Sequence, residues 1–108
     1  MALDYTVLLN AMVSAGENLG GTLWLDIETY AVPELQKIAI QIVAIEVNKD
    51  SYTPAGAQAL MDMQIKATIG VIVAMTTLAL LAVQNAINQI LAAVKSMVNA
   101  AIGFAIIP

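Results

Sequence analysis

The chain has 108 residues, of which 60% are hydrophobic and only 11% are charged, and its formal net charge is −4. It has four cationic side chains, all lysines, and no histidine or cysteine. This excludes disulfides, thiolate chemistry and the clustered cations that nucleic-acid binding needs. Ordinary globular proteins are about 45–50% apolar, and a domain this small buries only about 60% of its unfolded surface. We therefore predict a single all-helical domain, residues 1–108, whose apolar surface is covered by copies of itself or by lipid.

The first segment, residues 3–30, is predicted to be a helical region. Apolar residues recur at helical spacing from Leu3 to Ala15, and Gly20 and Gly21 then interrupt the pattern. Residues 22–30 fit a strand or a helix, and the helical neighbours on both sides favour a helix. No secretory signal is expected, because the start has no basic region and carries Asp4. A cytoplasmic or particle-assembled location is favoured, with a membrane location as the alternative.

An amphipathic helix is predicted over residues 33–49. Pro33 suits its first turn, because the missing N–H would have no partner there. Glu34 is favoured by the positive end of the helix dipole and is expected on the polar face. Turn-forming residues from 48 to 54 then end this helix.

The third segment is predicted to be one long apolar helix over residues 54–101, with Thr53 as its N-cap and Pro54 in its first turn. The 28 residues between Lys66 and Lys95 carry no charge, and a helix of that length spans about 40 Å, enough to cross a bilayer. Kinks are expected near Gly70 or Thr76–Thr77. The predicted fold class is all-α: a helical hairpin in which two shorter N-terminal helices pack on one long C-terminal helix, as an obligate oligomer or polymer.

Polar residues on this long helix recur close to an 11-residue period and fall on one narrow stripe at about 100° per residue. The main interpretation is a stripe that faces solvent on an oligomer. The alternatives are a polar line that faces a lumen or another stripe, and chance placement of amides. The predicted polar stripe comprises Asp62, Lys66, Thr77, Gln84, Asn88, Lys95 and Asn99.

Apolar residues on the remaining faces are predicted to form contacts between subunits. Burial of apolar area is the favourable term for such contacts, at roughly 25 cal/mol per Å². The predicted subunit interface comprises Trp24, Ile38, Ile42, Ile45, Ile72, Ala74, Leu78, Leu81, Ile87, Leu91 and Val94.

The sequence offers little for catalysis. Without histidine and cysteine, acid–base work would fall to carboxylates, lysine or tyrosine. The turn at Asp50 and Ser51 has too few oxygen ligands for a metal, and no glycine motif matches a phosphate cradle. We predict a protein that is not an enzyme, with no cofactor, no metal and no small-molecule substrate.

Two functional classes remain from the sequence. The favoured one is a non-enzymatic structural subunit that self-assembles through apolar helix faces into a homo-oligomer, filament or shell. The reason is that residues 67–94 contain more amides and threonines than a lipid-facing span usually has. The alternative is a small integral membrane or pore-forming protein whose helix over residues 67–94 inserts in the bilayer. An adaptor that hides its long helix in a heteromeric machine would have the same sequence pattern.

Overall fold

The computed structural model describes residues 3–107, and all regular structure in that range is helical. The predicted all-α class is confirmed. Within these residues five α-helices follow one another, with one short 3-10 turn, η1, before the third. They are α1 (Tyr5–Glu17), α2 (Leu23–Val47), η1 (Lys49–Ser51), α3 (Pro54–Met75), α4 (Leu80–Ala92) and α5 (Lys95–Ile102).

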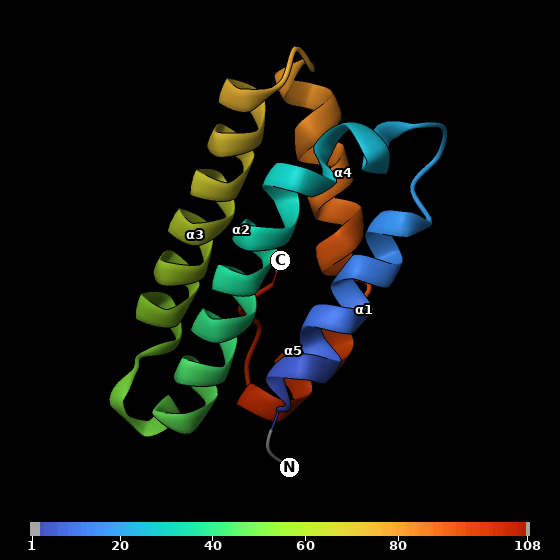
Figure 1. Ribbon diagram of the computed structural model, residues 1–108. Helices are drawn as coiled ribbons and strands as arrows, with labels where there is room; N and C mark the ends of the chain where they lie inside the picture. Colours follow the sequence, from blue (N-terminus) through green and yellow to red (C-terminus); the bar gives the residue numbers. More distant parts are fainter. Residues whose placement is uncertain (1–2, 108) are drawn as a thin grey trace.

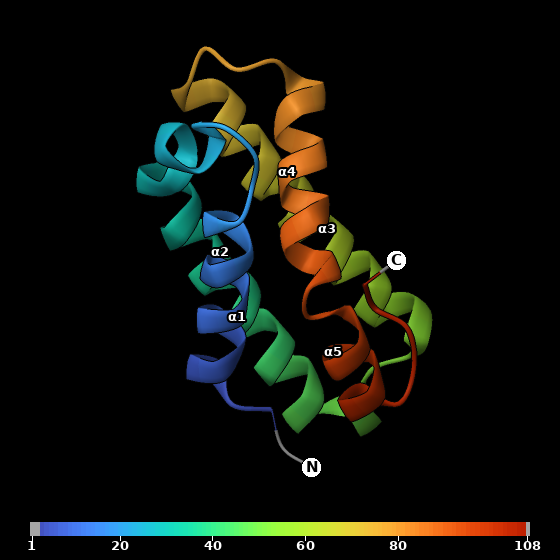
Figure 2. The ribbon, with the colours of Figure 1, turned by 90° about the vertical axis from the view of Figure 1, so that its right-hand side faces the viewer.

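Helices α1 to α4 form an up-and-down four-helix bundle (Figure 1). Contacts join α1 to α2, α2 to α3, α3 to α4, and α4 back to α1, so each helix lies between two neighbours. Short connections between antiparallel neighbours are typical of this architecture. Helix α5 continues beyond α4 and packs against α2, and the tail that follows it turns back beside α3 (Figure 2).

Three hydrogen bonds fix the start of α1. The Oδ1 atom of Asp4 accepts hydrogen bonds from the backbone N–H of Thr6 at 2.7 Å and of Val7 at 3.1 Å, as N-cap side chains do. The backbone N–H of Leu3 donates to Oε1 of Glu46 at 2.8 Å. The first residues of the described chain are therefore joined to the end of α2.

Helix α2 begins at Leu23 rather than at Pro33, and it passes through Pro33 without ending. Proline inside a helix removes one hydrogen bond and costs about 3 kcal/mol. Pro33 is exposed, as is Thr29, the residue whose carbonyl the missing N–H would have met. Packing of the opposite side outweighs this cost, because buried residues continue at helical spacing across the proline: Trp24, Ile27, Ala31, Leu35, Ile38.

Glu34 is buried rather than exposed on a polar face, with a relative exposure of 6%. A buried carboxylate needs a partner, since its desolvation is otherwise costly. That partner is Lys37, whose Nζ atom donates to Oε2 of Glu34 at 2.9 Å. The pair thus lies at the edge of the core, with the lysine reaching in from solvent.

The expected single helix over residues 54–101 is wrong, because α3, α4 and α5 are separated by turns at 76–79 and 93–94. Its predicted start is confirmed, since Thr53 caps α3 and Pro54 is its first residue. Thr76 is extended, and its hydroxyl donates to the carbonyl of Ile72 at 2.7 Å and accepts the N–H of Leu78 at 3.3 Å. Such bonds offer the backbone an alternative to another helical turn. The kink expected near Thr76 is therefore a full reversal of the chain.

A second, tighter turn joins α4 to α5. The N–H groups of Ala93 and Val94 donate to carbonyls three residues back, which is the 3-10 pattern that tightens a helix end. Helix α5 ends at Gly103, whose φ of 95° lies in the left-handed region that glycine adopts at helix ends. These two turns redirect the chain so that residues 104–107 reach α3.

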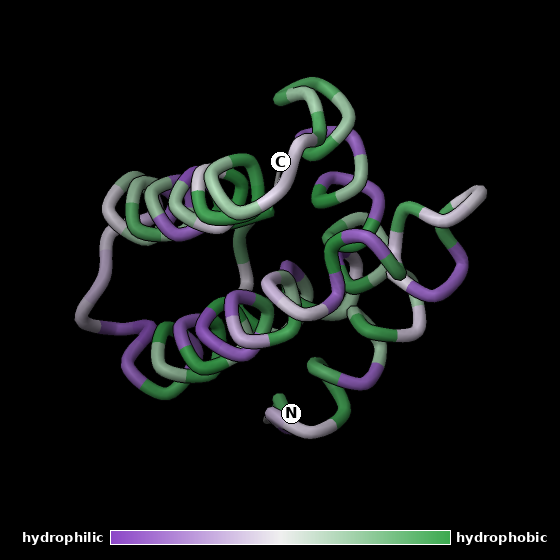
Figure 3. The backbone as a smooth tube through the Cα atoms, turned by 45° about the horizontal axis from the view of Figure 1, so that its top comes forward, coloured by the Kyte–Doolittle hydropathy of each residue, from purple (hydrophilic) through white to green (hydrophobic). Residues whose placement is uncertain are grey.

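The hydrophobic core lies between the helices of one copy, and hydrophobic positions recur along all of them (Figure 3). The accessible surface is 5802 Å². A folded monomeric protein of 11.3 kDa is expected to expose about 5,700 Å². A single copy thus folds as compactly as an ordinary monomer, and composition alone does not require a second copy to cover the core.

Gly16 gives the fold a sensitive point that the sequence analysis did not identify. A methyl group at Gly16 would overlap the ring of Trp24, which packs on the backbone of α1 at this position. We expect Gly16→Ala to lower the free energy of unfolding by about 1–3 kcal/mol, the usual cost of overpacking, although alanine is the better helix former. Urea unfolding followed by the fluorescence of Trp24, the single tryptophan, measures the effect.

Gly20→Ala is the matched control, because a Cβ atom at Gly20 meets nothing within 4 Å. We expect this variant to unfold within about 0.5 kcal/mol of the original protein. If Gly16→Ala were as stable as Gly20→Ala, the tryptophan ring would not lie against α1 as described.

Candidate functional site

The structure places most of the predicted subunit-interface residues in the core of one copy. Eight of the eleven have relative exposures of 7% or less, with contacts supplied by the other helices of the same bundle. A second copy cannot reach these side chains while the bundle stays folded. The eight core residues are Trp24, Ile38, Ile42, Ile45, Ile72, Ile87, Leu91 and Val94.

The other three predicted interface residues lie at or near the surface. Leu81 is 66% exposed at the start of α4, Ala74 is exposed on α3, and Leu78 is half-buried in the turn between them. Only these three, all close to the α3–α4 turn, remain available for contact with a partner.

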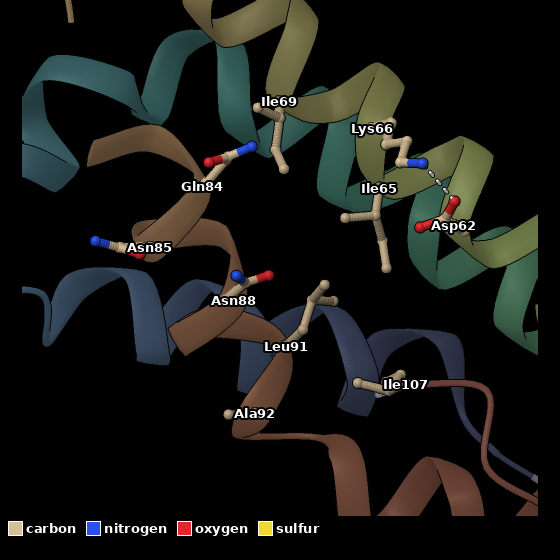
Figure 4. A pocket seen from close by; sticks show the side chains of 10 residues that line it. All are labelled: Asp62, Ile65, Lys66, Ile69, Gln84, Asn85, Asn88, Leu91, Ala92 and Ile107. Carbon is tan, nitrogen blue, oxygen red and sulfur yellow. Dashed lines mark ion pairs between the residues drawn. The ribbon is translucent and has the colours of Figure 1, made fainter. Parts of the chain in front are cut away.

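The chain reversal brings together four residues of the predicted polar stripe. Asp62 and Lys66 on α3 face Gln84 and Asn88 on α4 across a groove between the two helices (Figure 4). The sequence grouped these residues for a continuous helix, which does not exist. They meet because α4 runs back alongside α3.

This groove has a polar rim and an apolar floor. It has a volume of about 580 Å³, and its floor is formed by Ile65, Ile69, Leu91 and Ile107. On its rim Lys66 Nζ lies 2.9 Å from Asp62 Oδ2, and the two side chains are 74% and 59% exposed. An ion pair so exposed contributes at most about 0.5 kcal/mol on a helix. Because the single cation of the rim already has an anion beside it, the groove holds no free charge for an ionic ligand.

The remaining stripe residues are dispersed. Thr77 is exposed in the α3–α4 turn, Lys95 is exposed at the start of α5, and Asn99 is half-buried on α5. Only Asn99 has a defined role in the structure. The polar stripe is therefore not one continuous surface.

Asn99 binds the backbone of the tail. Its Oδ1 atom accepts the N–H of Ile106 at 2.9 Å and of Ile107 at 3.1 Å, and its Nδ2 atom donates to the carbonyl of Ile107 at 3.1 Å. Gln58 on α3 adds a bond from Nε2 to the carbonyl of Ala105 at 2.7 Å. Both isoleucines are buried, at 3% and 2% exposure. The tail is thus packed between α3 and α5 and is held there by two amide side chains.

This arrangement of the tail was not predicted from the sequence. The available signal was Gly103, a glycine at the end of a helical pattern, followed by an apolar stretch that includes Ile106 and Ile107. Such a pattern indicates a helix end with a packed segment after it. It does not indicate which amide side chain meets the segment.

One helix face stays apolar and unpartnered on the outside of the bundle. We define the α3 face as Leu60, Met63, Ala67, Val71 and Ala74, all exposed. Met63 is 67% exposed, and Leu60 and Val71 are 37% and 38% exposed. The spacing of three or four residues puts them in one row along the helix. Asp62 and Lys66 lie to one side of this row, so the row itself carries no charge.

Within residues 3–107 no group of three or more side chains is placed to hold a metal ion, and no buried side-chain nitrogen or oxygen lacks a hydrogen-bond partner. None of the helices described combines the length and the hydropathy that a bilayer span requires. No family model matches this chain, and neither a curated protein nor a solved structure is significantly similar to it.

Proposed function

We propose that this chain is a non-catalytic structural protein that associates with copies of itself through apolar side chains on the outside of the bundle. The observation that carries the proposal is the α3 face, an uncharged apolar row along an exposed helix. Scattered exposed apolar residues are normal on a soluble protein. A contiguous row of them indicates an interaction site.

The energetics favour association through this row more than through the α3–α4 groove. Covering Met63, which is 67% exposed, removes apolar surface from water at roughly 25 cal/mol per Å². No charged group of the row has to be desolvated. In the groove, by contrast, Asp62, Lys66 and three amides would have to be desolvated or paired again.

The membrane alternative loses the single helix over residues 67–94 on which it depended, because the turn at 76–79 divides that segment. The membrane alternative is tested by expressing the protein without detergent and measuring the fraction in which it is recovered. Recovery only in the membrane fraction, with release by detergent as a small oligomer, would contradict the proposal and favour the alternative.

Sedimentation velocity over a wide concentration range tests the proposal directly. We expect the weight-average mass of the original protein to rise with concentration, and Met63→Glu to remain monomeric with an unchanged melting temperature. A buried glutamate on a dimer contact would have to desolvate its charge, whereas at 67% exposure in the monomer it stays in water.

Asn88→Glu is the matched control, because it adds the same charge on the exposed rim of the groove, away from the α3 face. It should associate like the original protein. An original protein that stays monomeric up to millimolar concentration would overturn the proposal, as would equal effects of the two glutamates.

A further inference from the structure

The α3 face is symmetric along the helix about Ala67. Its five positions are separated by three, four, four and three residues. If the helix is turned end for end about Ala67, the position of Leu60 falls on that of Ala74, and the position of Met63 falls on that of Val71. The larger side chain of each pair thereby exchanges places with the smaller one.

We infer that the α3 face takes a second copy of this chain, with the two α3 helices antiparallel and related by a two-fold axis beside Ala67. This inference rests on the proposed self-association and specifies its geometry. A two-fold interface uses the same patch on both copies, so the patch must complement itself. Here Leu60 lies opposite Ala74 of the second copy, and Met63 lies opposite Val71.

The parallel arrangement fits less well. It would place Met63 against Met63 and Ala74 against Ala74, with a wide gap at one level and crowding at another. Packing at native density favours large residues opposite small ones. The order of sizes along α3 therefore selects the antiparallel pair.

Gly70 supplies an independent observation. It lies inside α3 and is exposed, and a Cβ atom built on it meets nothing within 4 Å. Glycine weakens a helix interior relative to alanine, and within one copy nothing in its surroundings requires it. On α3 it lies beside Ala67 and Ala74 at the edge of the α3 face, where the absence of a side chain lets a second helix approach closely.

The charges near the row are compatible with this pairing. Lys66 and Asp62 flank the α3 face and already form an ion pair at 2.9 Å within one copy. Each copy thus brings its own neutralised pair, and no unpaired charge is buried. The two-fold axis beside Ala67 also puts Lys66 of both copies on the same side of the contact, where each stays exposed beside its own Asp62.

The area of the contact predicts a weak dimer. Helix α3 has 22 residues, so it is about 33 Å long and, with its side chains, about 10–12 Å wide. Full face-to-face contact covers about 350 Å² of each copy in projection, well below the roughly 800 Å² per partner of a standard interface. The pair should therefore be in rapid exchange and visible only at high concentration.

Engineered cysteines test the orientation, because the chain has no cysteine of its own. Leu60→Cys and Ala74→Cys are made as separate single variants, mixed, and oxidised at high concentration. Intact-mass spectrometry then counts homodimers and heterodimers. We expect the mixed disulfide to exceed each homodimer at least fivefold, since in the antiparallel pair Leu60 of one copy lies opposite Ala74 of the other.

The outcomes separate the geometry from the association itself. Predominant Ala74→Cys and Leu60→Cys homodimers, or a statistical mixture, would overturn the antiparallel pair while sedimentation still shows association. Gly70→Ala gives a second readout: a higher melting temperature at low concentration together with a dissociation constant raised at least threefold. An unchanged dissociation constant would remove Gly70 from the contact and contradict the inferred close approach.

Discussion

Ile42→Ala is expected to lower the free energy of unfolding by about 2–5 kcal/mol, the range for truncating a fully buried aliphatic side chain. Ile42 lies in the second half of α2 with no exposed surface, and its environment is the core of one copy. The lost contacts and the resulting cavity are therefore intramolecular. Urea unfolding at two protein concentrations a hundredfold apart should give the same loss at both.

Leu81→Ala is the control for this prediction. Leu81 is 66% exposed, so its truncation should change the free energy of unfolding by no more than about 0.5 kcal/mol. Both residues were predicted from the sequence as subunit contacts. If the loss in free energy of unfolding of Ile42→Ala grew with protein concentration, Ile42 would lie in an interface between copies. That result would contradict its place in the core of one copy.

The sequence could not separate core from interface, because both consist of apolar side chains at helical spacing. Ile42 and Ile72 have the same pattern whether they face another helix of the same chain or a second copy. The difference depends on how many helices the chain forms. If residues 54–101 formed one long helix, one copy would have too few helices to enclose a core. Because the chain reverses between α3 and α4, helices of the same chain surround the core on all sides.

That reversal depends on details that composition and periodicity do not contain. The sequence indicated that the helix is weakened near Thr76–Thr77, and α3 does end at Met75, directly before these residues. Whether a pair of threonines bends a helix or ends it depends on which carbonyl the hydroxyl of Thr76 meets and on the packing that α4 gains against α1 and α3. Pro33 is the reverse case, in which a local helix breaker is overruled by packing.

The candidate sites show the same limit of sequence analysis. Asp62, Lys66, Gln84 and Asn88 were grouped together and do lie around one groove, but for a reason unrelated to the helical wheel. The α3 face was hidden because residues 54–75 are apolar on nearly all sides apart from the predicted polar stripe. Only the structure shows which of those apolar sides remains uncovered.

Asn99→Ala is expected to release the tail from the bundle. The variant removes three hydrogen bonds to the backbone of Ile106 and Ile107, each worth about 0.5–1.5 kcal/mol. The free energy for opening the tail should thus fall by about 2–4 kcal/mol. Hydrogen exchange of the Ile106 and Ile107 amides should accelerate at least about thirtyfold, because each 1.4 kcal/mol is a factor of ten.

Two asparagine variants make this prediction specific. Asn88→Ala removes the same side chain from the exposed rim of the groove and should leave the exchange of both amides unchanged. Asn99→Asp keeps the oxygen that accepts both N–H groups but loses the donor to the carbonyl of Ile107, so its effect should be intermediate. Equal protection of the tail in Asn99→Ala and Asn88→Ala would show that burial of the two isoleucines holds the tail without the amide.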